Sequence, residues 1–183
     1  MKFHETPLKG AYVVEPEPFF DARGGFARIF CQKELAGAGL GCDIVQANRS
    51  VNAKAGCVRG LHYQSPPKAE TKMVTCIRGA VRDVIVDLRR GSSTFLQWFG
   101  KTLTAENMLL IYAPAGFAHG FQTLEDNSEL LYLHTEFYSP DHEDGIRHDD
   151  PLLGIDWPLE PTGVSDRDRS HPLLTADFKG ICP

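Results

Sequence analysis

The stretch that decides the fold is C-V-R-G-L-H-Y-Q-S-P-P, which runs from Cys57 to Pro67. It reads as a short β-strand that stops at two prolines. Regular alternation directs Arg59 to one face of this strand and His62 and Gln64 to the other, unless a β-bulge at Gly60 re-aims them. A base beside a cation is an unusual choice for a core, but it suits a site for an anionic, carbonyl-containing ligand.

Short strand-like runs bounded by Gly, Pro, Asn or Asp recur along the whole chain. Besides 58–64, these runs are 25–31, 43–51, 72–78, 80–88, 107–113 and 129–137. In the first half only 33–38 reads as helix, and the Pro-, Asp- and Gly-rich tail from residue 150 is expected to cover the sheets as irregular structure with short helical turns. Many short strands with little helix indicate an all-β sandwich or barrel. We expect one domain, residues 1–183.

Two details of local structure follow from the same pattern. Arg78 and Gly79 are predicted to join two strands as a tight hairpin. Within 80–88, alternation places Val84, Val86 and Leu88 on one strand face, and Asp83 and Asp87 with the remaining apolar residues on the other.

The bulk composition excludes several classes of protein. The chain has 183 residues, 42% of them hydrophobic and 23% charged, which suits a folded domain with a sizeable core. A net charge of -5 without a basic block disfavours nucleic acid as the partner. No apolar run approaches the length of a membrane span. The five cysteines are scattered without a C-x-x-C pair and read as reduced thiols of a cytoplasmic protein: Cys31, Cys42, Cys57, Cys76 and Cys182.

The first candidate is a metal site. The run P-A-G-F-A-H (114–119) resembles the second motif of the cupin barrels, in which the histidine, here His119, is often a metal ligand. The first cupin motif usually supplies H-x-H and a glutamate, whereas this chain has His62 without the second histidine. Lys72 would also compete with a cation, and two histidines with at best Glu70 make a poor divalent site. We therefore expect no metal.

Acid–base chemistry fits the same residues better. His62 has a side chain whose ordinary pKa suits proton abstraction near neutral pH, and Lys72 can stabilise a developing oxyanion. A carboxylate on the second imidazole nitrogen would fix the tautomer. The candidates for that carboxylate are Asp83, Asp87 and Asp168, and the candidates for a proton donor on the opposite side are Tyr132 and Tyr138. Each of these residues alone also fits a structural role, so the prediction depends on their occurring together.

Polar residues on other strands are candidates for ligand binding. Arg23 and Arg59 are suited to bidentate contacts with phosphate, although a surface position explains an isolated arginine equally well. Gln46 and Asn48 alternate on one strand face, where they either bind a ligand or form an exposed polar face.

The ordered set of motifs resembles the dTDP-4-dehydrorhamnose 3,5-epimerase family over nearly the whole chain. The motifs are D-A-R-G-G-F-A-R, V-Q-A-N-R-S, V-R-G-L-H-Y-Q-S-P-P, K-M-V-T-C-I-R-G, D-V-I-V-D-L-R, P-A-G-F-A-H-G-F, L-Y-L-H-T-E-F-Y-S-P and S-D-R-D. The resemblance implies a cupin-type jelly-roll β-barrel with short peripheral helices. It also implies a homodimer that needs neither metal nor other cofactor and acts on a nucleotide-linked 4-keto-6-deoxy-hexose.

The resemblance also implies roles for individual residues. His62 is the base, Asp168 its dyad partner, Lys72 the group that holds the enolate oxygen, and Tyr132 the general acid. Tyr138 corresponds to the residue that stacks on the nucleotide base. The other substrate contacts implied are Arg23, Phe26, Gln46, Asn48, Arg59, His119, Glu143 and Arg167. In such dimers an N-terminal segment crosses to the partner, so Arg23 and Phe26 are expected to complete the other subunit's site.

The sequence departs from the family pattern in three places. Arg28 replaces a common glutamate that touches the nucleotide portion, Cys57-Val58 replaces Thr-Leu, and His148 replaces a tryptophan. Three alternatives therefore stay open: an epimerase that inverts only C3 or C5 of another nucleotide sugar, a non-catalytic sugar-nucleotide-binding cupin, and a metal-dependent oxygenase, which the missing H-x-H disfavours.

Overall fold

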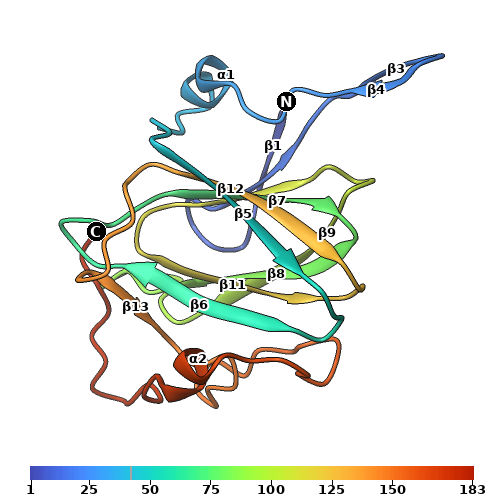
Figure 1. Ribbon diagram of the computed structural model, residues 1–183. Coiled ribbons are helices and arrows are strands. Elements are labelled where there is room, and N and C mark those ends of the chain that lie inside the picture. The colour runs from blue at the N-terminus through green and yellow to red at the C-terminus, as the bar shows by residue number, and fades with distance from the viewer. Residues whose placement is uncertain (42) are drawn as a thin grey trace.

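The computed structural model describes residues 1–41 and 43–183, and its architecture is built from two antiparallel sheets that face each other (Figure 1). The six-stranded sheet has the order β1 (Lys2–Glu5), β2 (Tyr12–Glu15), β10 (Leu110–Ala113), β7 (Lys72–Arg78), β12 (Ser128–His134) and β5 (Gln46–Asn52). The five-stranded sheet has the order β13 (Glu143–Gly145), β6 (Val58–Gln64), β11 (Phe117–Thr123), β8 (Ala80–Asp87) and β9 (Trp98–Thr104). The expectation of an all-β jelly roll is confirmed.

Three further elements lie outside these sheets. The strands β3 (Phe19–Asp21) and β4 (Gly24–Phe26) form a separate hairpin that projects away from the two sheets (Figure 1). The short helices are α1 (Gln32–Gly37) and α2 (Asp166–Ser170). The first of them matches the predicted helix 33–38 to within one residue at each end.

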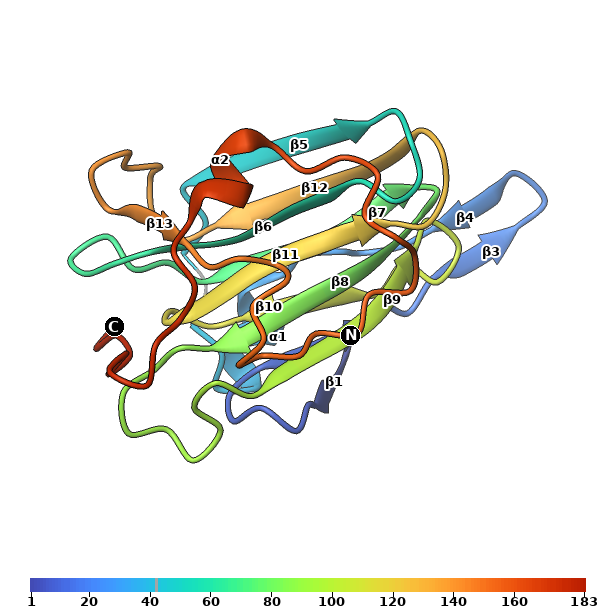
Figure 2. The ribbon, with the colours of Figure 1, turned by 90° about the horizontal axis from the view of Figure 1, so that it is seen from below.

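Apolar side chains fill the space between the sheets and also cover their outer faces. Val74 and Ile111 of the six-stranded sheet pack in one buried cluster with Ile85 and Phe121 of the five-stranded sheet. The outer face of the five-stranded sheet is covered by the C-terminal segment, which crosses in front of it in Figure 2. Burial of apolar area on both faces stabilises each sheet.

Strand β8 has the two faces that its sequence predicts. Val84, Val86 and Leu88 belong to the cluster under the C-terminal segment, which includes Leu153, whereas Ile85 belongs to the cluster between the sheets. The predicted cover of irregular structure with short helical turns over this sheet is therefore confirmed.

The predicted hairpin at Arg78 and Gly79 is wrong. Strand β7 pairs with β10 and β12, whereas β8 pairs with β11 and β9, so the chain changes sheets at Gly79 instead of turning back within one sheet. Gly79 has a φ of 70°, and a Cβ at this position would lie 2.6 Å from Ser128 Oγ. The reason for the error is that a tight connection between two strands looks the same in sequence whether or not the strands pair.

Other predicted strand boundaries agree with the structure in some places and differ from it in others. The structure confirms 58–64 and 72–78 residue for residue, but β10 begins at Leu110 instead of residue 107, because Met108 has a φ of 53° that ends an extended run. Strands β4 and β12 are shorter than the predicted runs 25–31 and 129–137, and β5 starts three residues later than the predicted run 43–51. The sequence prediction missed β1, β2, β3, β9, β11 and β13.

A bulge in β6 decides which side chains share the interior. Between the pairs His119–His62 and Phe121–Arg59, strand β6 advances three residues while β11 advances two. Gly60 lies at this point with a φ of 111°, and a Cβ there would lie 2.7 Å from both Gly120 Cα and the carbonyl oxygen of His119. The β-bulge that the sequence indicated as a possibility at Gly60 is therefore present. It brings Arg59 to the same side of strand β6 as His62.

No helix in the described part of the chain is long and apolar enough to cross a lipid bilayer. Four cysteines are free thiols, namely Cys31, Cys57, Cys76 and Cys182. The expectation for Cys42 falls outside the described residues.

Candidate active site

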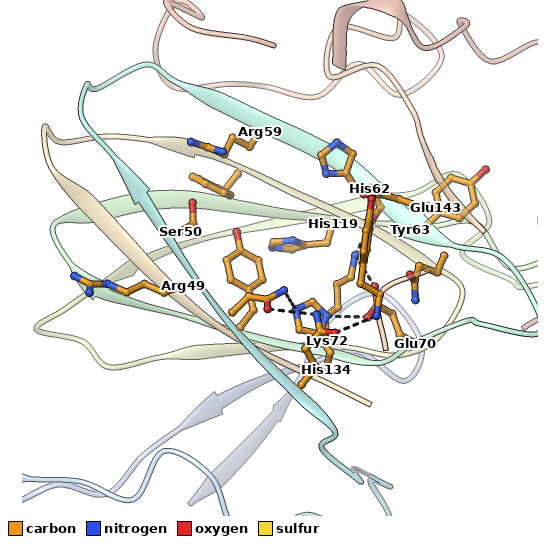
Figure 3. A pocket seen from close by; sticks show the side chains of 16 residues that line it. Arg49, Ser50, Arg59, His62, Tyr63, Glu70, Lys72, His119, His134 and Glu143 are labelled. Atoms are coloured by element: carbon orange, nitrogen blue, oxygen red, sulfur yellow. Dashed lines mark hydrogen bonds and ion pairs between the residues drawn. The ribbon is translucent and has the colours of Figure 1, made fainter. Parts of the chain in front are cut away.

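A cavity of about 280 Å³ opens between the two sheets, and it collects most of the predicted site residues (Figure 3). Strands β6 and β11 line it from one side, and β5, β7 and β12 line it from the other. Its lining includes the predicted residues Gln46, Asn48, Arg59, His62, Lys72, His119, Tyr132, Tyr138 and Glu143. A volume of this size is at the lower end of the range of small-molecule sites.

His62 forms a dyad with Asp168. The His62 Nε2 atom lies 2.7 Å from Asp168 Oδ1, and the Asp168 side chain is only 5% exposed. Burial opposes ionisation of Asp168, but the hydrogen bond and charge of His62, the Gly60 N–H and Ser165 together keep the pKa of this carboxyl below its ordinary value. Of the three candidate carboxylates, Asp168 is thus the one that orients His62.

Lys72 reaches the same cavity from the facing sheet. Its ammonium donates to the backbone carbonyl of His62 over 3.1 Å and forms an ion pair with Glu70 at 3.2 Å. The ring and the ammonium group therefore converge on one space, as required for a base and an oxyanion partner that act on one substrate.

His119 is held by a different carboxylate. Its Nε2 atom lies 2.7 Å from Asp83 Oδ2, and both side chains are buried. Burial raises the pKa of Asp83, and the adjacent His119 only partly offsets that effect. The third candidate carboxylate, Asp87, instead accepts hydrogen bonds from Arg89.

Tyr132 enters the cavity from β12, the sheet that faces His62. Its ring contacts that of His119 edge-on, with 5.7 Å between centroids. Burial, with a smaller contribution from Asp83, raises the pKa of Tyr132 well above its ordinary value although Arg59 opposes the shift, so the phenol stays protonated at neutral pH. Within residues 1–41 and 43–183, no hydrogen bond occupies its hydroxyl group, which is therefore free to donate to a ligand.

Tyr138 lies at the mouth of the cavity and is half exposed. Its hydroxyl donates to Glu143 Oε2 over 2.7 Å, and this bond is the main cause of the raised pKa of Tyr138. Arg167 forms an ion pair with the same glutamate at 2.6 Å. The backbone N–H of Tyr138 donates to Gln46, which joins the mouth to the polar face of β5.

Some expected site residues lie elsewhere. Arg23 and Phe26 belong to the projecting β3–β4 hairpin, where Arg23 pairs with Asp21 and Phe26 is 76% exposed. Neither residue lines the cavity of its own chain. Arg28, one of the departures from the family pattern, pairs with Glu34 at 2.7 Å and does not line the cavity either.

Sequence reasoning missed several lining residues. Gln64 does line the cavity, but its amide group links two backbone segments by bonding to Lys68 and Ser139. The sequence indicates Glu70 only as a weak metal ligand and predicts no role for His134. The other lining residues not singled out are Arg49, Ser50, Tyr63 and Phe121. The motif L-Y-L-H contained a signal for His134, because alternation puts it on the same strand face as Tyr132.

One group of side chains has the chemistry of metal ligands. His62, Asp168 and His171 each offer a ligand atom, and these atoms lie within 4.8 Å of one another. Two members of this group are already joined as the His62–Asp168 dyad. His119, the histidine of the cupin-like motif, is bonded to Asp83.

Fold and site together define the class of protein. A jelly roll whose interior places a carboxylate-held histidine opposite a lysine and a protonated tyrosine has the groups that acid–base chemistry beside a carbonyl requires. The family model described as dTDP-4-dehydrorhamnose 3,5-epimerase matches residues 5–176. The chain belongs to the dTDP-4-dehydrorhamnose 3,5-epimerase family, whose members are sugar-nucleotide epimerases.

Individual relatives agree with this assignment. An enzyme of Sinorhizobium fredii with that name is 41% identical over 175 residues, which cover 95% of this chain and 90% of the relative. The crystal structure of the Bacillus anthracis enzyme with TDP and PPi bound has a TM-score of 0.92 and 44% identity, covering 94% of this chain and 99% of that one. The Legionella pneumophila enzyme in complex with dTDP-4-keto-L-rhamnose has a TM-score of 0.91 and 36% identity, covering 100% and 98%.

Proposed function

We propose that the protein inverts C3 and C5 of dTDP-4-dehydro-6-deoxy-D-glucose and so forms dTDP-4-dehydro-L-rhamnose. The observation that carries this proposal is the convergence of His62, Lys72 and Tyr132 on one cavity from two facing sheets. A ketone at C4 acidifies the hydrogens on C3 and C5, so one base and one oxyanion partner serve both carbons. The family membership and the named relatives support the choice of substrate.

Each step uses a residue whose position is known. His62, oriented by Asp168, removes the proton next to the carbonyl through the nitrogen that Asp168 does not occupy, and the electron pair moves onto the C4 oxygen. The Lys72 ammonium, with His119, stabilises that enolate oxygen. Tyr132, from the facing sheet, returns a proton to the opposite face of the carbon, which inverts the centre. Proton exchange with water then returns His62 to its neutral form and Tyr132 to its phenol, and repetition at the second carbon completes the reaction.

The nucleotide portion is proposed to lie toward the mouth of the cavity. Tyr138 is exposed there for stacking, and Arg59 and Arg167 supply positive charge for the diphosphate. Gln46 and Asn48 on β5 and Glu143 on β13 are proposed as further substrate contacts.

The projecting hairpin supports a homodimer. Phe19, Phe20 and Phe26 are 67%, 64% and 76% exposed, which is unusual for three aromatic side chains on one short hairpin. We propose that this hairpin packs on a second copy of the chain and that Arg23 and Phe26 complete the partner's site. Residues 1–183 are proposed to act as one epimerase domain.

The proposed mechanism uses neither a metal ion nor an organic cofactor, because each proton transfer and the enolate charge are assigned to protein side chains. The free thiols of Cys31, Cys57, Cys76 and Cys182 support the expected cytoplasmic location.

The test is NMR spectroscopy of dTDP-4-keto-6-deoxy-glucose in D₂O with the purified protein. We expect deuterium at both C3 and C5 and signals of the inverted product, with the same result after dialysis against a chelator. Deuterium at one carbon only would establish the single-centre alternative. Binding without any exchange would establish the non-catalytic alternative, and activity that disappears with the chelator and returns with a divalent ion would establish a metal enzyme.

A further inference from the structure

The Glu70 carboxylate bridges two side chains in the wall of the cavity. Its Oε1 atom lies 3.2 Å from Lys72 Nζ and its Oε2 atom lies 2.8 Å from His134 Nδ1 (Figure 3). The three side chains are 7% to 10% exposed. A buried carboxylate with both oxygens occupied is held in one place, so whatever it bonds is held as well.

The Lys72 ammonium has three N–H donors, and the protein occupies two of them. One donates to the backbone carbonyl of His62, and a second faces Glu70 in an ion pair of 3.2 Å. Within the described ranges no third acceptor bonds to Lys72 Nζ, which leaves one donor for a ligand in the cavity. Two fixed bonds define the direction of the third on a side chain that otherwise rotates freely.

His134 is itself held in one tautomer. Gln46 donates an amide N–H to Asn48 Oδ1, and the Asn48 amide in turn lies 3.3 Å from His134 Nε2. Because the amide is a donor at this contact, Nε2 accepts and Nδ1 carries the proton that goes to Glu70. The ring also stacks on Tyr132 with 6.0 Å between centroids and 13° between planes. A chain of hydrogen bonds therefore runs from β5 across β12 to Glu70, and the ion pair of Glu70 extends it to the Lys72 ammonium.

We propose that Glu70 and His134 are positioning residues that aim the free N–H of Lys72 at the enolate oxygen. This inference rests on the proposed function. It also explains why the lysine of a site that needs positive charge is paired with its own counter-ion. An unpaired ammonium would point toward any available acceptor, whereas the paired one presents a single direction.

The charge state of the pair is consistent with this role. Burial opposes the ionisation of Glu70, but the hydrogen bond from His134 and the charge of Lys72 outweigh it, so the pKa of Glu70 is below its ordinary value. Glu70 is therefore a carboxylate throughout the neutral range.

The first experiment measures kcat and KM for Glu70→Gln, with Glu136→Gln as the matched control. Glu136 pairs with Lys68 at 3.4 Å and does not line the cavity. We expect Glu70→Gln to lower kcat by about 10²-fold, the typical cost of a small misplacement in an active site, while KM changes by less than about threefold. The control keeps both parameters. A Glu70→Gln enzyme with wild-type kcat would overturn the proposal.

The second experiment separates hydrogen bonding from packing at His134. His134→Asn keeps an N–H donor near the Nδ1 position, whereas His134→Phe keeps the ring without a donor. We expect the Phe variant to lose kcat as Glu70→Gln does and the Asn variant to retain at least about tenfold more, each corrected for the folded fraction by circular dichroism. The opposite order would show that His134 acts only by packing.

A third readout does not depend on activity. The ζ-¹⁵N signal of Lys72, assigned with Lys72→Gln, is compared at neutral pH in the wild type, in Glu70→Gln and in the control Glu136→Gln. Loss of the ion pair with Glu70 changes the surroundings of the ammonium nitrogen, so we expect the signal to shift in Glu70→Gln and to stay in place in the control. A signal that Glu70→Gln leaves unchanged would overturn the positioning role. If the wild type fails to exchange C3 and C5 hydrogens, the proposed function fails while this signal still reports on the Glu70–Lys72 pair.

Discussion

The Asp168 carboxylate holds His62 and the bulge of β6 at once, although Asp168 and His62 are 106 residues apart in the chain. Oδ1 lies 2.7 Å from His62 Nε2, and Oδ2 accepts the backbone N–H of Gly60 over 3.2 Å. Asp168 is fixed in turn, because its own N–H donates over 3.0 Å to Ser165, the N-cap of α2. His62 is therefore oriented by the segment that covers the sheet, and Asp168 leaves the Nδ1 atom of the ring unused.

Replacement of His62 tests the proposed first proton transfer. His62→Ala should lower the rate of deuterium uptake at C3 and C5 by at least about 10²-fold, because general base catalysis typically contributes 10²- to 10⁴-fold. Far-UV circular dichroism should be unchanged. The exposed histidine of β1 serves as the control, and His4→Ala should exchange at the wild-type rate. Wild-type exchange by His62→Ala would remove His62 from its role.

Acid unfolding tests the charge on Asp168. Its pKa is lowered in the folded state, so the carboxylate stabilises the protein above the unfolded value of about 4, and this contribution is lost as pH falls through the lower folded pKa. In urea titrations, wild type should exceed Asp168→Asn in unfolding free energy at pH 7. The difference should shrink below about pH 4. A difference that stays constant from pH 7 to pH 3 would contradict the shift, and the exposed Asp177→Asn provides the reference.

Removal of the Tyr132 hydroxyl separates proton removal from inversion. Tyr132→Phe keeps the ring contact with His119, so the cavity should keep its shape. Deuterium uptake should continue at C3 or C5, since His62 still acts, but the product should show retained configuration at one centre or both. NMR coupling constants of the sugar ring report this directly. Normal inversion by the variant would assign the acid role to Tyr138 or to water.

The sequence was most informative where residues carry chemistry and least informative where strands are fully buried. His62 and Lys72 were singled out because a base and a cation are rare on short strands, and both line the cavity. Strand β11 was missed because all seven of its residues are buried, which removes the alternation that marks a strand. The sequence indicated the motif that contains His119 but did not indicate that this motif forms a β-strand.

Other features depend on contacts between distant segments, which a single sequence does not display. Arg59 shares the cavity with His62 only because β6 has a bulge opposite Gly120, and sequence could only raise that possibility. Glu70 and His134 become a pair only when β7 and β12 are neighbours. The choice of Asp168 among three carboxylates was made by family resemblance, since the packing of α2 against β6 is a property of the folded chain.

Substitution of Gly60 tests whether the β-bulge of β6 requires glycine at this position. A Cβ there would lie 2.7 Å from the β11 backbone, and the φ of 111° is unfavourable for any other residue. Gly60→Ala should therefore cost at least about 2 kcal/mol in unfolding free energy and should reduce kcat by more than about tenfold by displacing His62. Gly91→Ala is the matched control, with a φ of 75° and open space around its Cβ. Equal effects of the two substitutions would show that backbone conformation alone, and not the close approach of β11, requires glycine at position 60.

Mixing two inactive variants tests whether the β3–β4 hairpin completes the partner's site. His62→Ala and Arg23→Ala, each impaired alone, are unfolded together and refolded at equal concentrations. If Arg23 acts across a symmetric dimer, half of the dimers are mixed and each of these has one site with both residues intact, so activity should reach about a quarter of the wild-type value. If Arg23 acts within its own chain, no site contains both residues and activity stays at the sum of the single variants. Sedimentation velocity on the same samples measures whether dimers form, and a monomer would contradict the proposed role of the exposed phenylalanines.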